Sequence, residues 1–245
     1  MLIHRGKFTL KRENSTHAAA FCILHAAGEQ LTQHLHLLHP EELSYYETLK
    51  FDRRRESYLL GRISAKKAIG ALSFFEDLSK IAIDAGIFQF PVVKYAITRN
   101  LQVSITHCEG LGIALSYPEV HPLGIDLERT DKANTEAIKQ QLTPAELALI
   151  RTAPLPEDVA CTMIWTMKEA LSKVLRTGLT MDLKLLEIQS LVREGDVYTS
   201  HFRHLIQYRA ISCHAGAYVC SIVVPGKTTP ELEEFWRFFM ETVSE

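Results

Sequence analysis

The chain contains two copies of one pattern, a helical stretch followed by a hairpin, and this repeat limits the folds open to it. GRISAKKAI aligns with KEALSKVL, and at nearly the same spacing SITHCEGLGIAL aligns with AISCHAGAYVCS. The aligned pairs are Arg62 with Glu169, Lys66 with Lys173, Ile105 with Ile211 and Gly110 with Gly216. A helix and a hairpin that occur twice indicate a duplicated α+β unit, although matches this short also arise by chance. The sequence therefore predicts an α+β protein of two similar lobes, at 1–120 and 121–245.

Composition and charge exclude several classes of protein. With 245 residues, of which 47% are hydrophobic and 23% charged, the chain has enough apolar surface to build cores for two lobes. A formal net charge of −2 argues against general nucleic-acid binding. The first residues, MLIHRGKFTLKRENS, contain no apolar leader, and no long apolar run follows. Five cysteines without a C-x-x-C pair indicate reduced thiols. We expect a cytoplasmic protein with no membrane or nucleic-acid partner.

Two carboxylates lie close together in the short apolar stretch LGIDLE, residues 123–128. Strand alternation places Asp126 and Glu128 on one face, with Ile125 and Leu127 on the other. Two such carboxylates repel each other, and a hard divalent cation removes that objection if a third carboxylate joins them. A solvated strand end is the ordinary interpretation of Asp-x-Glu when it occurs alone.

The stretch WTMKEALSKVLRTG, residues 165–178, is typical of a helix that ends near Gly178. Residues three and four apart share a helical face, which puts Trp165, Glu169, Ser172 and Lys173 on one side. Apolar surface on the other sides of this helix comes from Met167, Ala170, Leu171, Val174 and Leu175. By itself, a glutamate and a lysine four apart indicate a solvated ion pair.

Together the two stretches resemble a known family. GIDLE followed by WTMKEALSK is similar to the paired signature of the 4′-phosphopantetheinyl transferases, Gly-(Ile/Val)-Asp-x-Glu and then Trp-(Ser/Thr)-x-Lys-Glu-(Ala/Ser)-x-x-Lys. VSITHCEG at 103–110 resembles the Ser-His-Ser segment that precedes GIDLE in that family, and LLGRISAKKAI at 59–69 resembles its N-terminal Gly-Arg helix. The order and spacing of these elements agree from about Pro40 to Pro225.

The resemblance implies transfer of 4′-phosphopantetheine from coenzyme A to a serine of an acyl or peptidyl carrier protein, with release of adenosine 3′,5′-bisphosphate. It implies Mg²⁺, with Mn²⁺ as an alternative, held by Asp126, Glu128 and Glu169. Lys173 would offset charge on the phosphoryl oxygens. Glu169, or a water that it orients, would accept the proton of the serine. A carboxylate bound tightly to metal is a weak base, so the dominant role of Glu169 stays open.

Coenzyme A is the implied co-substrate, and basic and hydroxyl groups are expected to bind its phosphates. The residues assigned to this role are Arg55, Arg62, Lys66, Thr106, His107 and Lys173. Arginine forks and lysine ammonium groups suit phosphates, although a basic run is more often a solvated face. The chain departs from the family where Phe90-Pro91 replaces a Gly-(Lys/Arg/Gln)-Pro element, and where Glu42 and Tyr45 replace two lysines of the first helix. Part of the phosphate pocket is therefore missing or relocated.

The resemblance also implies two lobes related by pseudo-twofold symmetry, an active site at their interface, and a monomer. The length matches the two-lobed, surfactin-synthetase-activating type, which serves polyketide, nonribosomal-peptide or fatty-acid carriers. The short holo-acyl-carrier-protein synthases are instead single lobes that trimerise. Two rival hypotheses are a non-catalytic member that binds carrier proteins and a different Mg²⁺-dependent phosphoryl transferase. No P-loop or kinase motif supports the second rival.

Overall fold

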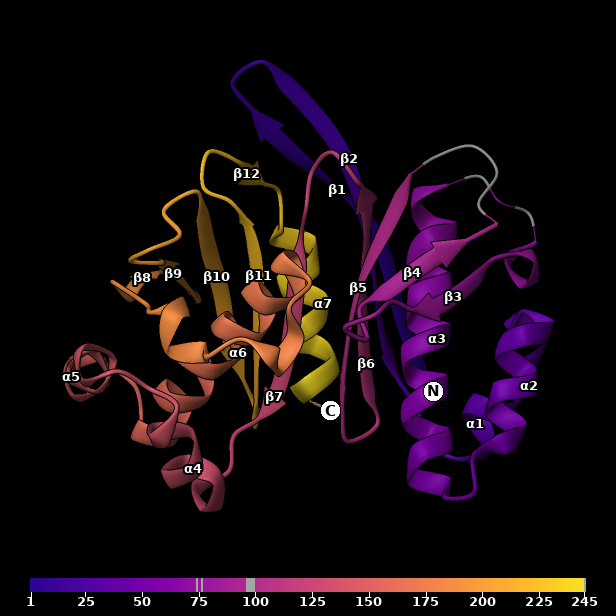
Figure 1. The fold of residues 1–245 in the computed structure, drawn as a ribbon, viewed down its shortest axis with the longest axis horizontal. Helices are drawn as coiled ribbons and strands as arrows, with labels where there is room; N and C mark the ends of the chain where they lie inside the picture. Colours follow the sequence, from indigo (N-terminus) through magenta and orange to yellow (C-terminus); the bar gives the residue numbers. More distant parts are fainter. Residues whose placement is uncertain (74, 76, 96–99, 245) are drawn as a thin grey trace. The chain divides into compact units, whose positions relative to one another are not determined.

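A computed structural model describes residues 1–73, 75, 77–95 and 100–244 of the chain (Figure 1). The chain divides into two compact units, of which unit 1 holds Met1–Pro122 and Thr229–Thr242, and unit 2 holds Leu123–Thr228 and Val243–Glu245. Each unit contains a five-stranded sheet and helices. The predicted α+β class is confirmed, and the main division of the chain falls two residues after the predicted boundary at 120.

Unit 1 is built on a sheet with the strand order β12-β1-β2-β6-β5, paired antiparallel throughout. Its strands are β1 (Leu2–Arg12), β2 (Ser15–His25), β5 (Leu101–Cys108), β6 (Leu111–Pro118) and β12 (Thr229–Pro230), with a separate pair β3 (Ala82–Ala85) and β4 (Pro91–Lys94). Its helices are α1 (Glu29–Thr32), α2 (Pro40–Thr48), α3 (Asp52–Leu72) and α7 (Glu233–Ser244). Pro40 followed by Glu41 and Glu42 predicts a helix start, and the basic run from Asp52 predicts a second helix; α2 and α3 confirm both.

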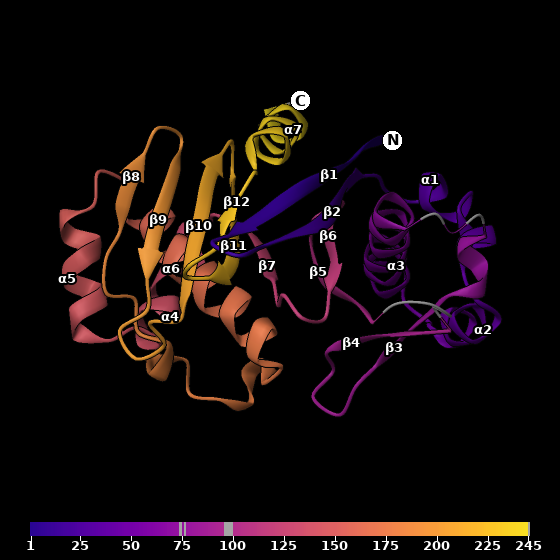
Figure 2. The same cartoon turned by 90° about the horizontal axis from the view of Figure 1, so that it is seen from above.

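The strand β2 is buried on both faces, which explains its unbroken apolar run. Cys22 and its neighbours at even positions belong to the core formed with α3. Phe21 points to the opposite face and meets Phe235 of α7 edge-on, with ring centroids 5.4 Å apart. Figure 2 shows α3 and α7 against this sheet. The final helix therefore covers unit 1, whereas the sequence assigned it to the second lobe. Its aromatic residues find their partners only through contacts distant in the chain.

Unit 2 has the strand order β7-β11-β10-β9-β8, again antiparallel. Its strands are β7 (Gly124–Arg129), β8 (Val192–Glu194), β9 (Val197–His201), β10 (Tyr208–Ala215) and β11 (Tyr218–Pro225). Its helices are α4 (Thr135–Gln140), α5 (Pro144–Thr152) and α6 (Glu157–Leu175). The strand predicted at 123–128 is β7, and the helix predicted from Trp165 is the second half of α6.

The helix α6 ends earlier than predicted. Its last residue is Leu175, and Arg176 takes the left-handed conformation with φ 58°. Glycine is the usual residue at this position, because a side chain is disfavoured in that conformation. Gly178 has φ 53° but lies beyond the helix end.

The two units repeat one topology, as the sequence comparison predicted. In each, a strand is followed by short helices, one long helix and two hairpins, so that β2, α3 and β5–β6 correspond to β7, α6 and β10–β11. In both copies of the repeat the first strand pairs with the last one, as β2 with β6 and β7 with β11. Duplication is therefore supported by strand order as well as by sequence.

The alignment predicted within this repeat is wrong in detail. Ladder pairs place Cys108 and Ala215 at equivalent positions just before their turns, so the predicted match of Ile105 with Ile211 is one residue out. The different turns of the two hairpins explain this error of one residue in the alignment. Glu109 and Gly110 both have positive φ, whereas Gly216 occupies the first position of its turn. Primed hairpin turns of the two kinds need glycine at different places.

Two smaller expectations concern thiols and membranes. All five cysteines are free thiols, and four of them are buried, as predicted. Within the part of the chain that the structure describes, no helix has the length and apolar character to cross a membrane.

Candidate active site

The strand β7 presents Asp126 and Glu128 on one face, and α6 covers that face. Asp126 pairs across the ladder with Ser221 of β11, so their side chains share a side of the sheet. The hydroxyl of Ser221 lies 2.7 Å from that of Thr166 on α6. This buried hydrogen bond fixes the helix above the strand that carries the two acidic residues.

Gly124 lets α6 cross β7 at very short range. A Cβ atom on Gly124 would lie 2.0 Å from the carbonyl oxygen of Ala170 and 2.8 Å from Cγ2 of Val174. No side chain fits at such a distance, so only glycine allows this approach. The crossing places the turn of α6 that contains Glu169 and Lys173 directly beside the strand.

Lys173 connects the helix to the strand. Its ammonium group donates a hydrogen bond to Oδ1 of Asp126 over 2.7 Å and another to the carbonyl oxygen of Ile125 over 2.9 Å. Asp126 is buried, while Lys173 keeps 27% of its side chain exposed. The lysine therefore neutralises one carboxylate and still presents part of its surface to solvent.

Glu128 and Glu169 are half-buried acids with strongly shifted titration. Burial raises the pKa of Glu128 to about 7, with further contributions from the negative charges of Asp126 and Glu169. Burial also raises the pKa of Glu169 to about 7, and Asp126 adds to that shift. Lys173 lowers the pKa of both groups but does not cancel these effects. The site concentrates more negative charge than one lysine offsets.

This electrostatic arrangement predicts a pH dependence of stability. The folded-state pKa of Glu128 and Glu169 lies above the ordinary value of 4.5, so their protonation favours the folded state. Their contribution is present below about pH 4.5 and is lost as the pH rises through about 7. We expect the free energy of unfolding to fall by about 2–3 kcal/mol across this range, after a discount for solvent screening. Thermal unfolding between pH 5 and 8 measures it, and a Glu128→Gln/Glu169→Gln variant should lose the dependence.

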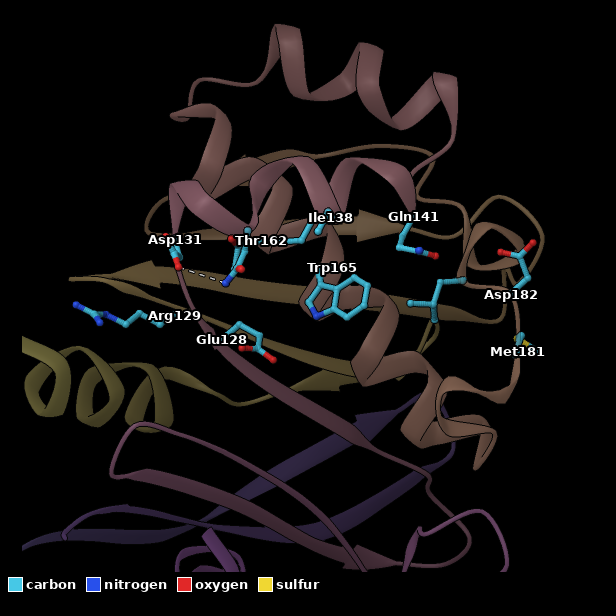
Figure 3. A pocket seen from close by; sticks show the side chains of 12 residues that line it. Glu128, Arg129, Asp131, Ile138, Gln141, Thr162, Trp165, Met181 and Asp182 are labelled. Carbon is cyan, nitrogen blue, oxygen red and sulfur yellow. Dashed lines mark hydrogen bonds between the residues drawn. The ribbon is translucent and has the colours of Figure 1, made fainter. Parts of the chain in front are cut away.

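A cavity of about 540 Å³ opens beside Glu128 (Figure 3). Its lining residues are Glu128, Arg129, Asp131, Asn134, Ala137, Ile138, Gln141, Thr162, Trp165, Met181, Asp182 and Leu183. Trp165 lies among them, one turn before Glu169 on α6. Apolar side chains such as Ile138, Trp165 and Leu183 share this lining with charged and polar ones, a mixture that suits a polar organic ligand.

These features occur in a stretch that matches a protein-family model. Residues 122–223 match the model of the 4′-phosphopantetheinyl transferase superfamily. The match contains β7, α6 and the cavity, and it supports a phosphopantetheinyl transferase role in general. A search of curated proteins found no match to the chain.

The metal set predicted for this superfamily domain was tested against the side chains. Among the residues that the structure describes, no three His, Cys, Asp or Glu side chains are arranged to hold a metal ion. Asp126 nevertheless lies near enough to raise the pKa of both Glu128 and Glu169, and Glu169 adds to the shift of Glu128. Three hard oxygen donors with excess negative charge fit Mg²⁺ chemically, although their carboxyl groups would have to converge on it.

All the residues assigned to coenzyme A except Lys173 lie in unit 1, and Lys66 does not suit that role. Its side chain is fully buried, with Nζ 2.8 Å from Oε2 of Glu42 and 3.0 Å from the carbonyl oxygen of Leu78. No part of Lys66 is exposed to a phosphate, so the prediction for this residue is wrong. The helical pattern placed Lys66 correctly on α3. It did not predict the burial of Lys66, because the partner Glu42 lies on a different helix, α2.

Arg55 and Arg62 remain accessible in part on α3. Arg55 donates from Nε to the carbonyl oxygen of Leu49 over 2.7 Å, and Arg62 lies with its guanidinium 4.8 Å from the ring centre of Tyr58. These contacts hold the stems and leave other guanidinium nitrogens available for a ligand.

On β5, Thr106 is buried and His107 is exposed, as alternation requires. The ring of His107 lies beside α3, since a Cβ on Gly61 would be 3.7 Å from its Cδ2. Gly61 directly precedes Arg62, so the helix turn that carries Arg62 and the end of β5 are neighbours in unit 1.

Two residues of the superfamily domain were not assigned a role from sequence. Lys168, within the WTMKEALSK stretch, and Glu146, at the start of α5, form a fully buried ion pair of 2.7 Å. Thr143-Pro144-Ala145-Glu146 indicates a helix cap, which is confirmed. The similar start of α2 at Pro40 and Glu42 was the available signal that Glu146 does more than cap a helix.

Proposed function

We propose that this protein transfers 4′-phosphopantetheine from coenzyme A to a serine of an acyl or peptidyl carrier protein in an Mg²⁺-dependent reaction. The observation that carries the proposal is the position of Asp126, Glu128, Glu169 and Lys173. Asp126 and Glu128 lie on β7, and Glu169 and Lys173 lie on the part of α6 that crosses it, within the stretch that matches the superfamily.

Asp126, Glu128 and Glu169 would hold the cation. When bound, Mg²⁺ supplies positive charge to the pyrophosphate oxygens of coenzyme A and stabilises the leaving group. Lys173 holds Asp126 in place through its ion pair, and its partly exposed side chain would bring positive charge near the phosphoryl oxygens. The raised pKa of Glu128 and Glu169, about 7 in each case, is consistent with carboxylates grouped to receive a cation.

Glu169, or a water that it orients, would accept the proton from the carrier serine, a role that competes with tight binding of the cation by the same carboxylate. A general base works best with a pKa near the working pH, and the pKa of Glu169 is raised to about 7. The serine oxygen forms a bond to the β-phosphorus of coenzyme A while the bond from that phosphorus to the bridging oxygen breaks. The proton passes to Glu169, and adenosine 3′,5′-bisphosphate leaves with the electron pair.

Unit 1 would supply groups for the nucleotide phosphates. Arg55, Arg62, Thr106 and His107 stay in this proposal, because the two arginines and His107 present accessible surface and Thr106 offers a hydroxyl donor. Lys66 is omitted because it is buried. A carrier protein as partner and a monomeric state, which the resemblance implies, and a cytoplasmic location, which the composition led us to expect, complete the proposal.

Mass spectrometry of a carrier protein tests the reaction. An apo carrier protein incubated with this protein, coenzyme A and Mg²⁺ should gain one phosphopantetheine group, and the gain should disappear with a chelator. The Glu169→Gln variant should slow the gain by on the order of 10²–10³-fold. The Glu136→Gln variant, at an exposed position on α4, is the matched control and should transfer at the normal rate.

The negative results separate the rival hypotheses. Coenzyme A binding without transfer to several carriers would indicate narrow carrier choice within the same reaction. Carrier binding without coenzyme A binding would replace the proposal by the non-catalytic carrier-binding function. Release of a phosphate from another nucleotide, with none from coenzyme A, would indicate a different phosphoryl transferase.

A further inference from the structure

The ion pair between Glu146 and Lys168 connects several segments of unit 2. Both side chains have no exposed surface. Oε2 of Glu146 accepts a hydrogen bond from the backbone N–H of Thr143 over 2.8 Å, and Oε1 accepts one from the N–H of Ile188 over 2.8 Å. Lys168 also donates to the carbonyl oxygen of Gln141 over 3.4 Å. One buried pair therefore holds together the start of α5, the middle of α6 and the segment that leads to Ile188.

The same arrangement occurs in unit 1. Oε2 of Glu42 accepts from the N–H of His39 over 2.9 Å and lies 2.8 Å from Nζ of Lys66, while Oε1 accepts from the N–H of Ile83 over 2.9 Å. Lys66 thus corresponds to Lys168 and not to Lys173, which corrects the predicted alignment of the helices. The buried carboxylate on the preceding helix sets this equivalence, and short sequence similarity cannot show it.

The segments that the unit 2 pair connects are also walls of the cavity. Gln141, which accepts the hydrogen bond from Lys168, lines the cavity. Trp165, which lies one turn before Lys168 on α6, lines it too. The segment that leads to Ile188 lines the cavity as well, through Met181, Asp182 and Leu183. Lys168 is the residue directly before Glu169. In unit 1 the equivalent pair connects α2, α3 and β3. The residues that line the cavity in Figure 3 all belong to unit 2.

We propose that Glu146 and Lys168 are positioning residues, which hold the cavity walls in register with the turn of α6 that carries Glu169. A buried charge pair is weak evidence for stability alone, because apolar residues of similar volume often serve equally well. Its hydrogen bonds to the backbone of Gln141 and Thr143, before α5, and of Ile188 are what apolar residues cannot provide. The activity part of this inference rests on the proposed function, whereas the positioning part does not.

The test compares Lys168→Met with Lys66→Met, which removes the same ammonium group from the equivalent pair in unit 1. Both are made in a Trp236→Phe background, so that Trp165 is the only tryptophan. We expect Lys168→Met to change the emission and the acrylamide quenching of Trp165 and to speed amide exchange at Ile188. Lys66→Met should leave Trp165 unchanged and speed exchange at Ile83 instead.

Transfer kinetics provide the second readout. Lys168→Met should lower kcat/KM for coenzyme A by on the order of 10²-fold, because small displacements of a site have effects of this size. Lys66→Met, measured at a temperature where both variants are folded, should lower it less than about threefold. If the wild-type protein transfers nothing, the proposed function fails, and the fluorescence and exchange results still decide the positioning role.

A double variant separates positioning from stability. Glu146→Met/Lys168→Met replaces the pair with apolar groups and is expected to fold even if Lys168→Met alone does not. It still lacks the hydrogen bonds to Thr143, Ile188 and Gln141, so Trp165 quenching should differ from the wild type and kcat/KM should stay low. A folded double variant with wild-type Trp165 quenching and wild-type kinetics would overturn the proposal. So would equal effects of Lys168→Met and Lys66→Met on Trp165 and on transfer.

Discussion

The Asp126→Asn variant is expected to transfer phosphopantetheine about a thousandfold more slowly than the wild type, and yet to remain folded. The loss follows from removing a carboxylate proposed to hold the cation, which weakens charge stabilisation in the transition state. The fold should survive because the asparagine amide keeps the volume of the aspartate side chain and removes repulsion from Glu128 and Glu169. Steady-state transfer assays together with thermal unfolding measure the two effects.

The same variant carries an electrostatic signature. The charge of Asp126 raises the pKa of both glutamates, so its removal should lower the pKa of Glu128 and Glu169 toward the ordinary value. The fall in stability between pH 5 and 8 should then become smaller than in the wild type. Carboxyl titration by NMR would show the shift directly.

Asp84→Asn is the matched control. Asp84 also forms an ion pair with a lysine, Lys94, but on the exposed β3–β4 pair of unit 1. It should keep the wild-type rate and the wild-type pH dependence. An Asp126→Asn variant that transfers at the rate of Asp84→Asn would rule out a role for Asp126 in the reaction.

Local patterns in the sequence were sufficient to predict the elements that carry the candidate site. The alternation in LGIDLE fixes which side chains of β7 share a face, and the Thr143-Pro144 and Pro40 starts fix where α5 and α2 begin. Each of these signals depends on residues a few positions apart. For this reason Asp126 and Glu128 could be placed on one face of a strand, and Glu169 and Lys173 on one face of a helix, whereas only the family resemblance implied that the two faces work together.

Features that depend on distant partners were not predictable in the same way. The basic spacing of α3 suggested that Lys66 faces a ligand, but the carboxylate of Glu42 draws it into the core. The amphipathic pattern of α7 does not reveal which sheet it covers, and Phe235 finds Phe21 only in the folded unit. The pairing of Lys168 with Glu146 is of the same kind. From sequence alone a lysine on a helix is interpreted as exposed, because the carboxylate that pairs with it in the core lies on another element.

The Gly124→Ala variant is expected to show the second large effect, a loss of about 3 kcal/mol or more in the free energy of unfolding. Its Cβ would lie 2.0 Å from the carbonyl oxygen of Ala170, which belongs to helix backbone and cannot rotate away. The helix or the strand must therefore move. For a chain of this size the melting temperature should fall by about 6–12 °C, which calorimetry measures.

The displacement should also reduce transfer in the protein that is still folded. Ala170 follows Glu169, so a shift of α6 away from β7 separates Glu169 and Lys173 from Asp126. Gly195→Ala is the control, because Gly195 has φ 65° and no atom within 4 Å of its Cβ position. It should cost about 1 kcal/mol through backbone strain alone and leave transfer unchanged. If Gly124→Ala lost no more stability than Gly195→Ala and kept full transfer, the close crossing of α6 and β7 would not be what brings the carboxylates together. A large loss of both stability and transfer for Gly124→Ala alone would tie the glycine of the GIDLE stretch to the geometry of the site.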